Sequence, residues 1–310
     1  MFKNITPYLF DVPSLAGLEE AARQMLYLPC APSAASSFGW VPPRGEENAP
    51  MVETVAGQIV MRMRVEHRNV PASAIAKKVK ELAAKIEELT GRKPGRKQTK
   101  DLKEQALHEL LPNAFSKTKD VWVWLDRKTG RLIVGAIGKV CEVPITSLVR
   151  SVEGMAIRPL QSRTSPAVAM TTWLQQGEAP AGFSIDRECE LHSCDEMRSV
   201  VRYTRHALDT NEVREHIAQG KAPTRMAMTY AGRVSFVLTE CGELRRIDFD
   251  DVVLGDRAKH VEQNAEAFDA DVAIATGELQ PLITDLLDAL GGELQPGDLP
   301  DELTQGRAAG

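Results

Sequence analysis

The change of hydrophobic period near residue 70 constrains the fold more than any other feature of this chain. Residues 59–66 alternate with a period of two, as in a strand with one buried face. After Pro71 the apolar residues step by four and three, which predicts a helix that packs on another helix. These seam residues are Ile75, Val79, Leu82, Ile86 and Leu89. Residues 91–95 interrupt the pattern with glycines and a proline, and a second helix is predicted from about Thr99 to Leu111. So short a connection predicts an antiparallel helical hairpin that projects as an arm.

Positive charge is concentrated in this arm. The window 77–103 holds ten Lys or Arg and four Asp or Glu, a net charge of +6, whereas the whole chain carries −5. The most basic point is the turn, with Arg92, Lys93, Arg96 and Lys97. Such segregation is typical of a nucleic-acid binder, because a polyanion is attracted to one place and repelled elsewhere. The alternative is a solvated helix face of Lys and Glu residues.

The totals set the broad class. A chain of 310 residues is long enough for two domains, or for one domain built from two halves. We find no basic-then-apolar leader and no apolar run near the roughly 20 residues that span a bilayer, so we expect a cytoplasmic protein with no membrane partner. Five scattered cysteines indicate reduced, mostly structural thiols. They are Cys30, Cys141, Cys189, Cys194 and Cys241.

The order of predicted elements recurs along the chain. Before the recurrence we expect a strand at 2–10, a helix at 14–28, a turn-rich linker to residue 43, a hairpin of 121–125 with 132–137, a helix at 145–152, a strand at 155–160 and a helix at 167–175. After it we expect a strand at 198–205, a helix capped by Asp209 with Glu212, strands at 226–230, 234–238 and 244–249, a helix at 258–267, a strand at 272–275 and a helix at 279–290. We interpret this as two structural repeats, roughly 52–177 and 183–292. The predicted fold class is α+β, a pseudo-twofold body of antiparallel sheets flanked by helices, with the arm inserted.

The domain boundaries follow from this interpretation. Residues 1–70 and 119–180 are expected to form the first half of the α+β body, residues 71–118 the basic helical arm, and residues 181–294 the second half. Residues 295–310 are polar and rich in Pro and Gly, so we expect a disordered tail.

Sequence patterns for catalysis are weak. The chain has no GxxxxGK[ST], GxGxxG or GxSxG sequence, and its six histidines never pair at the i, i+4 spacing of a helical metal site. Two acidic pairs, Asp250–Asp251 and Asp269 with Asp271, are of a kind that holds Mg²⁺ in a nuclease, but neither has a third ligand at fixed spacing. We therefore predict no enzymatic activity, no cofactor and no metal site.

Several segments, taken in order, resemble one family. They are FGWVPP at 38–43, GQIV at 57–60, LHELLPNAFS at 107–116, HIAQGK at 216–221, and FDAD at 268–271 with TGEL at 276–279. Their joint order and spacing are similar to those of the recombination-associated RdgC family, from near residue 2 to near residue 292. The resemblance implies a ring-shaped homodimer that holds duplex DNA in its central hole without sequence preference. It also implies a nucleoid-associated protein that limits the access of the RecA recombinase to DNA by occupying its substrate.

The resemblance implies roles for single residues as well. In the family a phenylalanine just after the Leu-Leu-Pro step closes the ring against the other subunit, and the matching residue is Phe115. The alternative is a core phenylalanine at the foot of the arm. Where the family lines the ring with a basic and a polar residue, this chain has Arg205 and His206, so the second donor is pH-dependent. Lys221 matches a further lysine, which either faces DNA or complements a helix C-terminus.

The charge pattern supports a second basic surface. The window 198–225 holds six Lys or Arg and three Asp or Glu, a net charge of +3, and aromatic residues are sparse in both windows. This favours contact with the duplex backbone over base stacking. The predicted DNA-binding residues are Lys77, Lys78, Arg92, Lys93, Arg96, Lys97, Lys100, Arg202, Arg205, His206 and Lys221, and the predicted dimer-interface residue is Phe115. Two rival functions stay open: a metal-dependent nuclease acting on recombination intermediates, and a protein-interaction scaffold whose arm docks an acidic partner.

Overall fold

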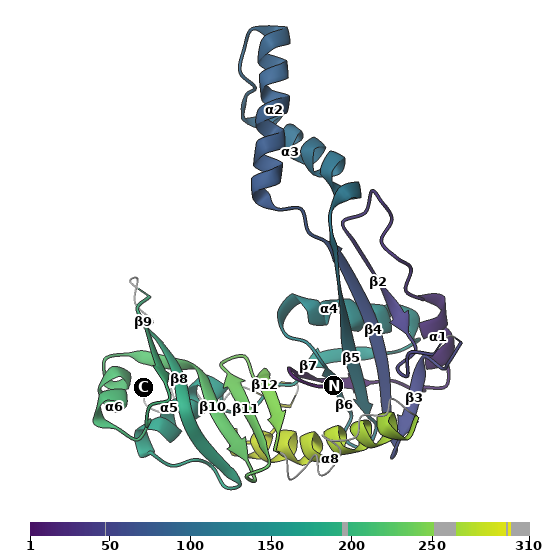
Figure 1. Cartoon of the computed structure of the whole chain (residues 1–310). Coiled ribbons are helices and arrows are strands. Elements are labelled where there is room, and N and C mark those ends of the chain that lie inside the picture. Colours follow the sequence, from purple (N-terminus) through teal and green to yellow (C-terminus); the bar gives the residue numbers. More distant parts are fainter. Residues whose placement is uncertain (47, 194–197, 251–264, 296, 299–310) are drawn as a thin grey trace.

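The computed structural model describes residues 1–46, 48–193, 198–250, 265–295 and 297–298. These residues form an α+β structure with two antiparallel sheets, which confirms the predicted class. Figure 1 shows that a helical arm projects from one end of the first sheet and that the second sheet lies beside the other end. The arm and the second sheet therefore bound the inner side of a bend. Most of the predicted tail, residues 295–310, lies outside the described residues.

The first sheet carries the arm. Within the described residues it has seven strands, in the order β2-β4-β5-β6-β1-β7, with β3 paired to β4. Its strands are β1 (Thr6–Asp11), β2 (Ser36–Val41), β3 (Val52–Val55), β4 (Gln58–Arg68), β5 (Ser116–Asp126), β6 (Arg131–Val134) and β7 (Ala156–Pro159). One face packs against the helices α1 (Leu18–Gln24) and α4 (Glu142–Ser151), the second of which follows the short helix η2 (Gly138–Cys141). The strands β4 and β5 pair along their whole length and continue into the arm, so the arm stands on the two longest strands of this sheet.

The strand β4 is buried on more than the one face that its sequence predicts. Ile59, Met61, Met63 and Val65 lie in the core on the α1 and α4 side, as the alternation indicates. Val60 points the other way and is also fully buried. The second face is covered at this end because the C-terminal helix packs there.

The arm consists of two helices that contact each other, as predicted. They are α2 (Ala72–Thr90) and α3 (Arg96–Leu110), followed by the short helix η1 (Leu111–Asn113). Gly91 ends α2 because its φ of 68° is in the left-handed region that glycine adopts without strain. The seam is only partly covered, since α3 buries Leu102 and Ala106 whereas no residue of α2 is buried. The arm is therefore held by a thin contact and exposes most of its surface.

The second sheet has one covered and one open face. Its strands, in the order β12-β11-β10-β8-β9, are β8 (Phe183–Ser193), β9 (Val200–Thr204), β10 (Lys221–Tyr230), β11 (Val234–Thr239) and β12 (Leu244–Phe249). A core of apolar side chains joins one face to the helices α5 (Pro166–Gln176), α6 (Asn211–Ala218) and α8 (Ala265–Ala289). No helix is packed on the other face within the described residues, and polar side chains project from it.

The long helix α8 connects the two sheets (Figure 1). Near its start, Val272 packs with Val55 and Val60 of the first sheet. Further along, Gln280 Nε2 donates to Asp126 at 3.0 Å, whereas the hydroxyl of Tyr230 in the second sheet donates to Asp285 at 2.5 Å. A single helix packed on both sheets sets the angle between them, and with it the shape of the inner side.

Three sequence predictions about secondary structure are wrong. The linker before residue 43 contains the strand β2, and the predicted 14–28 helix ends at Gln24 because Met25 and Tyr27 exchange backbone hydrogen bonds with Trp40. The predicted strand at 272–275 lies inside α8, because this apolar run packs on the first sheet as one side of a long helix. The helix predicted at 258–267 lies largely outside the described residues. Without the strand at 272–275 the two halves do not share one element order to the end, and the pseudo-twofold repeat stays a prediction.

The predicted capping of α6 is also wrong. The N-cap residue is Thr210 rather than Asp209, and it makes no side-chain capping bond. Glu212 does not close a capping box, because its carboxylate accepts a hydrogen bond from the buried Tyr203 hydroxyl at 3.2 Å. The contact ties α6 to the edge strand β9 instead.

Gly39 gives a prediction about stability. A Cβ placed on it would lie 2.4 Å from the backbone N and Cα of Tyr27, and neither atom can move without breaking the pairing of that segment with β2. Gly39→Ala is therefore expected to lower the free energy of unfolding by about 3 kcal/mol, at the upper end of the overpacking range. Gly277→Ala is the control, because open space surrounds Gly277 in α8 and the substitution should stabilise the helix by up to about 1 kcal/mol. Equilibrium urea unfolding measures both, and equal midpoints would contradict the expectation.

Candidate nucleic-acid interface

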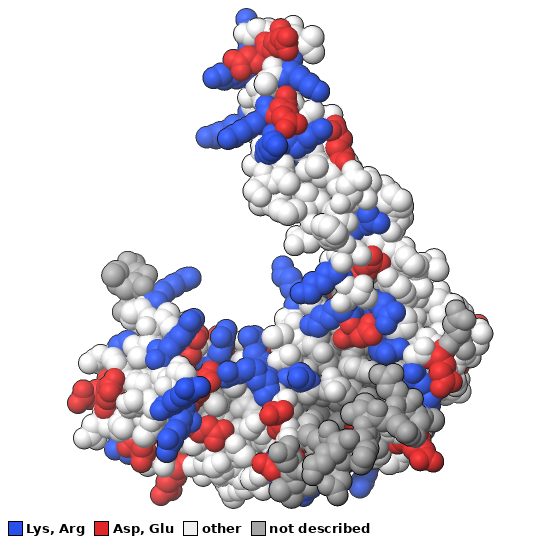
Figure 2. All heavy atoms as spheres, in the orientation of Figure 1, with Lys and Arg blue, Asp and Glu red and all other residues white. Residues whose placement is uncertain are grey.

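Basic side chains cover the arm, as the sequence predicts. Figure 2 shows Lys and Arg along the arm and again on the second sheet, on the inner side of the bend. The predicted arm residues Lys77, Arg92, Lys93, Arg96, Lys97 and Lys100 are all exposed. Lys78 is partly covered because its ammonium pairs with Glu109 of α3 at 2.8 Å, and this hydrogen bond lowers the pKa of the Glu109 carboxyl. Lys78 therefore joins the two helices, whereas the other six present charge to solvent.

The predicted residues of the second basic window lie at the far end of the inner side. Arg202 is on the edge strand β9, and Arg205 and His206 follow that strand. Arg205 has a φ of 55°, in the left-handed region that an L-residue rarely adopts. Lys221 begins β10, and its ammonium lies 3.2 Å from Nδ1 of His216 and 3.3 Å from Oε1 of Gln219. The structure keeps this group on the second sheet and its edge, apart from the arm.

The residues of this group do not share one face. Tyr203 points into the core toward α6, and the rings of His206 and His216 lie 5.3 and 6.3 Å from its ring. Lys221 lies with His216, so His206 and Lys221 are at the α6 edge of the sheet. Arg202 precedes Tyr203 on the strand and points to the open face, because successive side chains alternate. The single surface predicted from the window 198–225 is therefore two neighbouring surfaces.

The open face of the second sheet holds three arginines that were not among the predicted DNA-binding residues: Arg225, which was counted in the basic window 198–225, and Arg245 and Arg246, which were not. Arg225 of β10 lies in register with Glu190 of β8, which is in register with Arg202. On β12, Arg245 and Arg246 line the same hollow as Arg202 and Arg225, a cavity of about 380 Å³. In the sequence, this basic surface is indicated by the consecutive arginines Arg245 and Arg246 within the strand pattern of residues 244–249. They could not be assigned to this face, because the face depends on the register of strands distant in sequence.

Phe115 is displayed to solvent. It lies between η1 and β5, its side chain is 91% exposed, and its backbone carbonyl accepts from the amide of Asn69 at 3.1 Å. The core alternative for Phe115 is therefore wrong. Leu89, near the outer end of α2, is also strongly exposed at 84%. Truncating either side chain removes almost no core packing.

One acidic residue of the two predicted pairs forms an ion pair, and three of the cysteines are buried. Asp269 binds the guanidinium of Arg44 at 2.6 Å, and Asp251 lies outside the described residues. Within the described ranges, no group of three or more His, Cys, Asp or Glu residues is placed to hold a metal ion. Cys30, Cys141 and Cys189 are buried free thiols and Cys241 is an exposed one, while Cys194 lies outside the described residues. Burial raises the pKa of Cys189 to about 12, so this thiol is protonated and unreactive at neutral pH.

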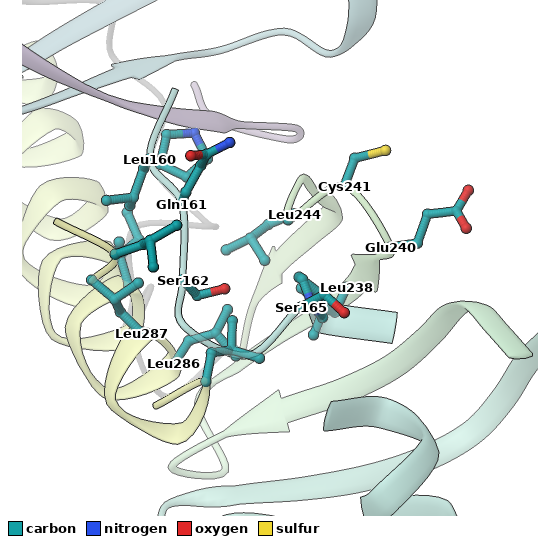
Figure 3. Close-up of a pocket in the computed structure, with 16 residues that line it drawn as sticks. Leu160, Gln161, Ser162, Ser165, Leu238, Glu240, Cys241, Leu244, Leu286 and Leu287 are labelled. Atoms are coloured by element: carbon teal, nitrogen blue, oxygen red, sulfur yellow. The ribbon is translucent and has the colours of Figure 1, made fainter. Parts of the chain in front are cut away.

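A second cavity has a different chemistry. Figure 3 shows leucines of α8 and of the β11–β12 region, among them Leu244, Leu286 and Leu287, pointing into a hollow of about 280 Å³. Polar residues also line it, among them Gln161, Ser162, Glu240 and Cys241. Its lining includes no lysine or arginine that would attract a phosphate, so this cavity is not part of the candidate interface. Among the residues that the structure describes, no helix is long and apolar enough to cross a membrane.

Comparison with known proteins identifies the family. A family model described as "Putative exonuclease, RdgC" matches residues 1–293. The chain is 41% identical over 297 residues to the recombination-associated protein RdgC of Herminiimonas arsenicoxydans, which covers 94% of this chain and 98% of that protein. It is 40% identical over 299 residues to the protein of the same name from Janthinobacterium sp. (strain Marseille), with 95% and 99% covered. The RdgC of Bordetella pertussis is 41% identical over 297 residues, again covering 94% and 98%. Matches of this length and identity, on a chain whose inner side carries two basic surfaces, show that it belongs to the RdgC family of recombination-associated proteins.

Proposed function

We propose that this protein binds duplex DNA without sequence preference, as a homodimer closed into a ring, and so limits the access of RecA to DNA. The observation that carries the proposal is the placement of positive charge on the arm and the second sheet, on the inner side of the bend (Figure 2). The chain as a whole carries −5, so a duplex is attracted to the inner side and repelled elsewhere. The protein blocks recombination by occupying the substrate, with no chemical step of its own.

The side chains favour duplex over single-stranded DNA. Single-strand binders stack bases on exposed aromatic rings. Among the described residues the strongly exposed aromatic side chains are Phe38 and Phe115, and neither belongs to the basic windows. The exposed Lys and Arg residues instead match the regularly spaced phosphates of a duplex backbone.

A ring explains both the bend and the display of Phe115. One bent subunit leaves its inner side open, and a second copy related by a twofold axis closes it. An aromatic side chain exposed at the foot of the arm is a suitable anchor for the contact that completes closure, because buried aromatics dominate interface energies. DNA held in a closed ring leaves only by sliding off an end.

The salt dependence of binding tests the proposal. The logarithm of the affinity for a short linear duplex should fall linearly with the logarithm of salt concentration, with a slope of about −0.9 for each phosphate contacted, and should be almost the same for unrelated sequences. Fluorescence anisotropy over a salt series, with two duplexes of different composition, measures both. A strong sequence preference with little salt dependence would overturn the model.

The nuclease and scaffold alternatives are separable by direct assays. The description of the matching family model names an exonuclease, which is the observation in favour of a nuclease. End-labelled duplex incubated with Mg²⁺ or Mn²⁺ is expected to keep its length, and progressive shortening would establish the nuclease instead. Competition by unrelated DNA tests the scaffold. If the protein is a scaffold for an acidic protein, added DNA should displace little of that partner. If the protein binds DNA without sequence preference, unrelated DNA should displace a labelled linear duplex.

A further inference from the structure

The hollow on the open face of the second sheet is surrounded by guanidinium groups. Arg202, Arg225, Arg245 and Arg246 line this cavity of about 380 Å³, which we call the arginine pocket. Arg202 and Arg225 come from strands on either side of β8, and the other two come from β12 beyond β11. Four residues from three strands therefore converge on one hollow that no other part of the described chain fills.

An irregularity in β12 directs two consecutive residues to the same pocket. In a regular strand Arg245 and Arg246 would point to opposite faces. The pairing of β11 with β12 shifts register between Ser235 and Val237, and Arg246 has a φ of 50°. Its backbone amide donates to Asn4 Oδ1 at 3.1 Å, which holds this conformation from outside the strand. A bulge that re-aims a side chain is costly for a non-glycine residue, and such irregularities are concentrated at functional sites.

Glu190 holds two of the arginines in place. Its side chain is buried at the floor between them, and the residue is 9% exposed. The carboxylate accepts from Arg202 Nε at 2.6 Å and from His192 Nε2 at 2.8 Å, and lies 3.8 Å from Arg225 Nη1. Burial by itself would raise the pKa of Glu190, but the hydrogen bond from His192 and the charges of Arg225 and Arg202 outweigh it, so the pKa is lowered and the group stays ionised.

The four arginines keep donors to spare after these pairings. Arg245 pairs with Glu243 at 2.7 Å and Arg246 with Glu188 at 2.5 Å, so three carboxylates face four guanidinium groups. Each guanidinium carries five N–H donors in a rigid fork, and a carboxylate uses at most two of them. Exposed pairs of this kind add little to stability, so stabilisation alone gives no reason to gather four of them round a hollow.

We propose that the arginine pocket receives a phosphate group of the DNA backbone, with Arg225 and Arg245 as contacts and Glu190 as the residue that positions Arg202 and Arg225. The fork geometry of arginine matches phosphate oxygens in a two-bond contact. The pocket lies on the open face of the second sheet, over which basic side chains gather in Figure 2. This inference rests on the proposed function, because it assigns a contact for the same duplex.

Charge-removing variants test the contact residues. Arg225→Gln with Arg245→Gln should flatten the salt slope of duplex binding by about one unit, because both residues are proposed to contact the same phosphate. The matched control is Arg158→Gln with Arg233→Gln, which removes the same charge from residues paired with Glu293 and with Glu278 of α8, away from the pocket. If the pocket variant and the control have equal slopes, the pocket is not on the DNA path, although duplex binding by the parent would still uphold the proposed function. Absence of duplex binding by the parent removes both proposals.

Glu190→Gln separates positioning from simple attraction. The substitution removes a negative charge, so charge alone predicts tighter duplex binding. Loss of the contacts that position Arg202 and Arg225 predicts weaker binding, although the number of basic residues is unchanged. Circular dichroism and the melting temperature confirm that the variant is folded, and Glu190→Asp, which keeps the carboxylate, should recover part of the affinity. Tighter binding by Glu190→Gln would overturn the positioning role.

Inorganic phosphate distinguishes a backbone phosphate from a free one. At constant ionic strength, replacing chloride by phosphate should weaken duplex binding by the parent and have less effect on the Arg225→Gln, Arg245→Gln variant. If inorganic phosphate instead saturates the parent at submillimolar concentration while the variant keeps the parent's duplex slope, the pocket serves a free phosphate and the backbone proposal is wrong.

Discussion

Replacing Phe115 by Ala is expected to leave the protein folded and to abolish its retention on circular DNA. The side chain is 91% exposed, so its truncation removes almost no core packing and the melting temperature should stay nearly constant. If the ring closes through this residue, the same truncation costs about 2 kcal/mol or more of association, which is roughly thirtyfold or more in the closure equilibrium. An unlatched ring slips off a duplex that has no ends. Binding to short linear duplex should change much less, because the basic residues are intact.

Two further variants calibrate this experiment. Phe38→Ala removes an exposed ring from the edge strand β2, outside the arm helices, and should retain circular DNA like the parent. Phe236→Ala removes a ring that is 2% exposed and should cost about 3–5 kcal/mol of folding stability. Retention is measured by challenging preformed complexes on nicked circles with excess competitor and following their decay. The role of Phe115 in ring closure is contradicted if the Phe115→Ala complex on circular DNA decays no faster than the Phe38→Ala complex. It is also contradicted if the folding stability of Phe115→Ala falls toward that of Phe236→Ala.

Replacing the four arm-turn cations, Arg92, Lys93, Arg96 and Lys97, by Gln should reduce the salt dependence of duplex binding more than any other change. Removing four cations that each neutralise one phosphate flattens the log–log slope by about 3.6 units. Raising the salt concentration from 50 to 200 mM should therefore lower the affinity of the parent and of the variant by different factors. The factor for the parent should be about 10² times the factor for the variant. Fold stability should be unaffected, because all four side chains are exposed. The measurement is a salt titration by fluorescence anisotropy on a duplex long enough to fill the ring.

A variant of equal charge tests whether position matters. Substituting Gln for Arg127, Lys128, Arg150 and Arg163 removes the same number of charges from exposed sites between residues 119 and 180, outside both basic windows. Long-range attraction alone would weaken binding equally in the two variants. Direct contact by the arm predicts a large change of slope in the arm variant and a small one in this control. Equal slopes would leave the arm as a solvated helix face of Lys and Glu residues.

The helix α8 links these predictions, because it sets the distance across which the arm and the second sheet face each other. It packs on Val60 of the first sheet and on Leu238 of the second, and it is joined to both by side-chain hydrogen bonds. The arm itself rests on a contact that buries only Leu102 and Ala106. Closure of a ring is therefore more easily accommodated by movement of the arm than by a change in the angle between the sheets.

Local sequence patterns were sufficient for the arm and for most strands. The steps of four and three through Leu82, the glycine at 91 and the proline at 112 depend on contacts between residues close in the chain, and these act in the same way in any tertiary context. The segregation of charge can likewise be counted from the sequence. The family resemblance also came from segments readable in order. Where local signals were ambiguous, as in the apolar run 272–275, tertiary packing made a helix of a predicted strand.

The sequence by itself determined the class of fold, the basic arm and the family, whereas only the tertiary structure decided which arginines share a surface. Glu190, Arg202 and Arg225 are neighbours because three strands distant in sequence pair in one register. Arg246 points into the same pocket because a bulge turns its backbone. The exposure of Phe115 also followed from how the foot of the arm packs. Register and packing are set by contacts between residues far apart in the chain, and no local pattern encodes them.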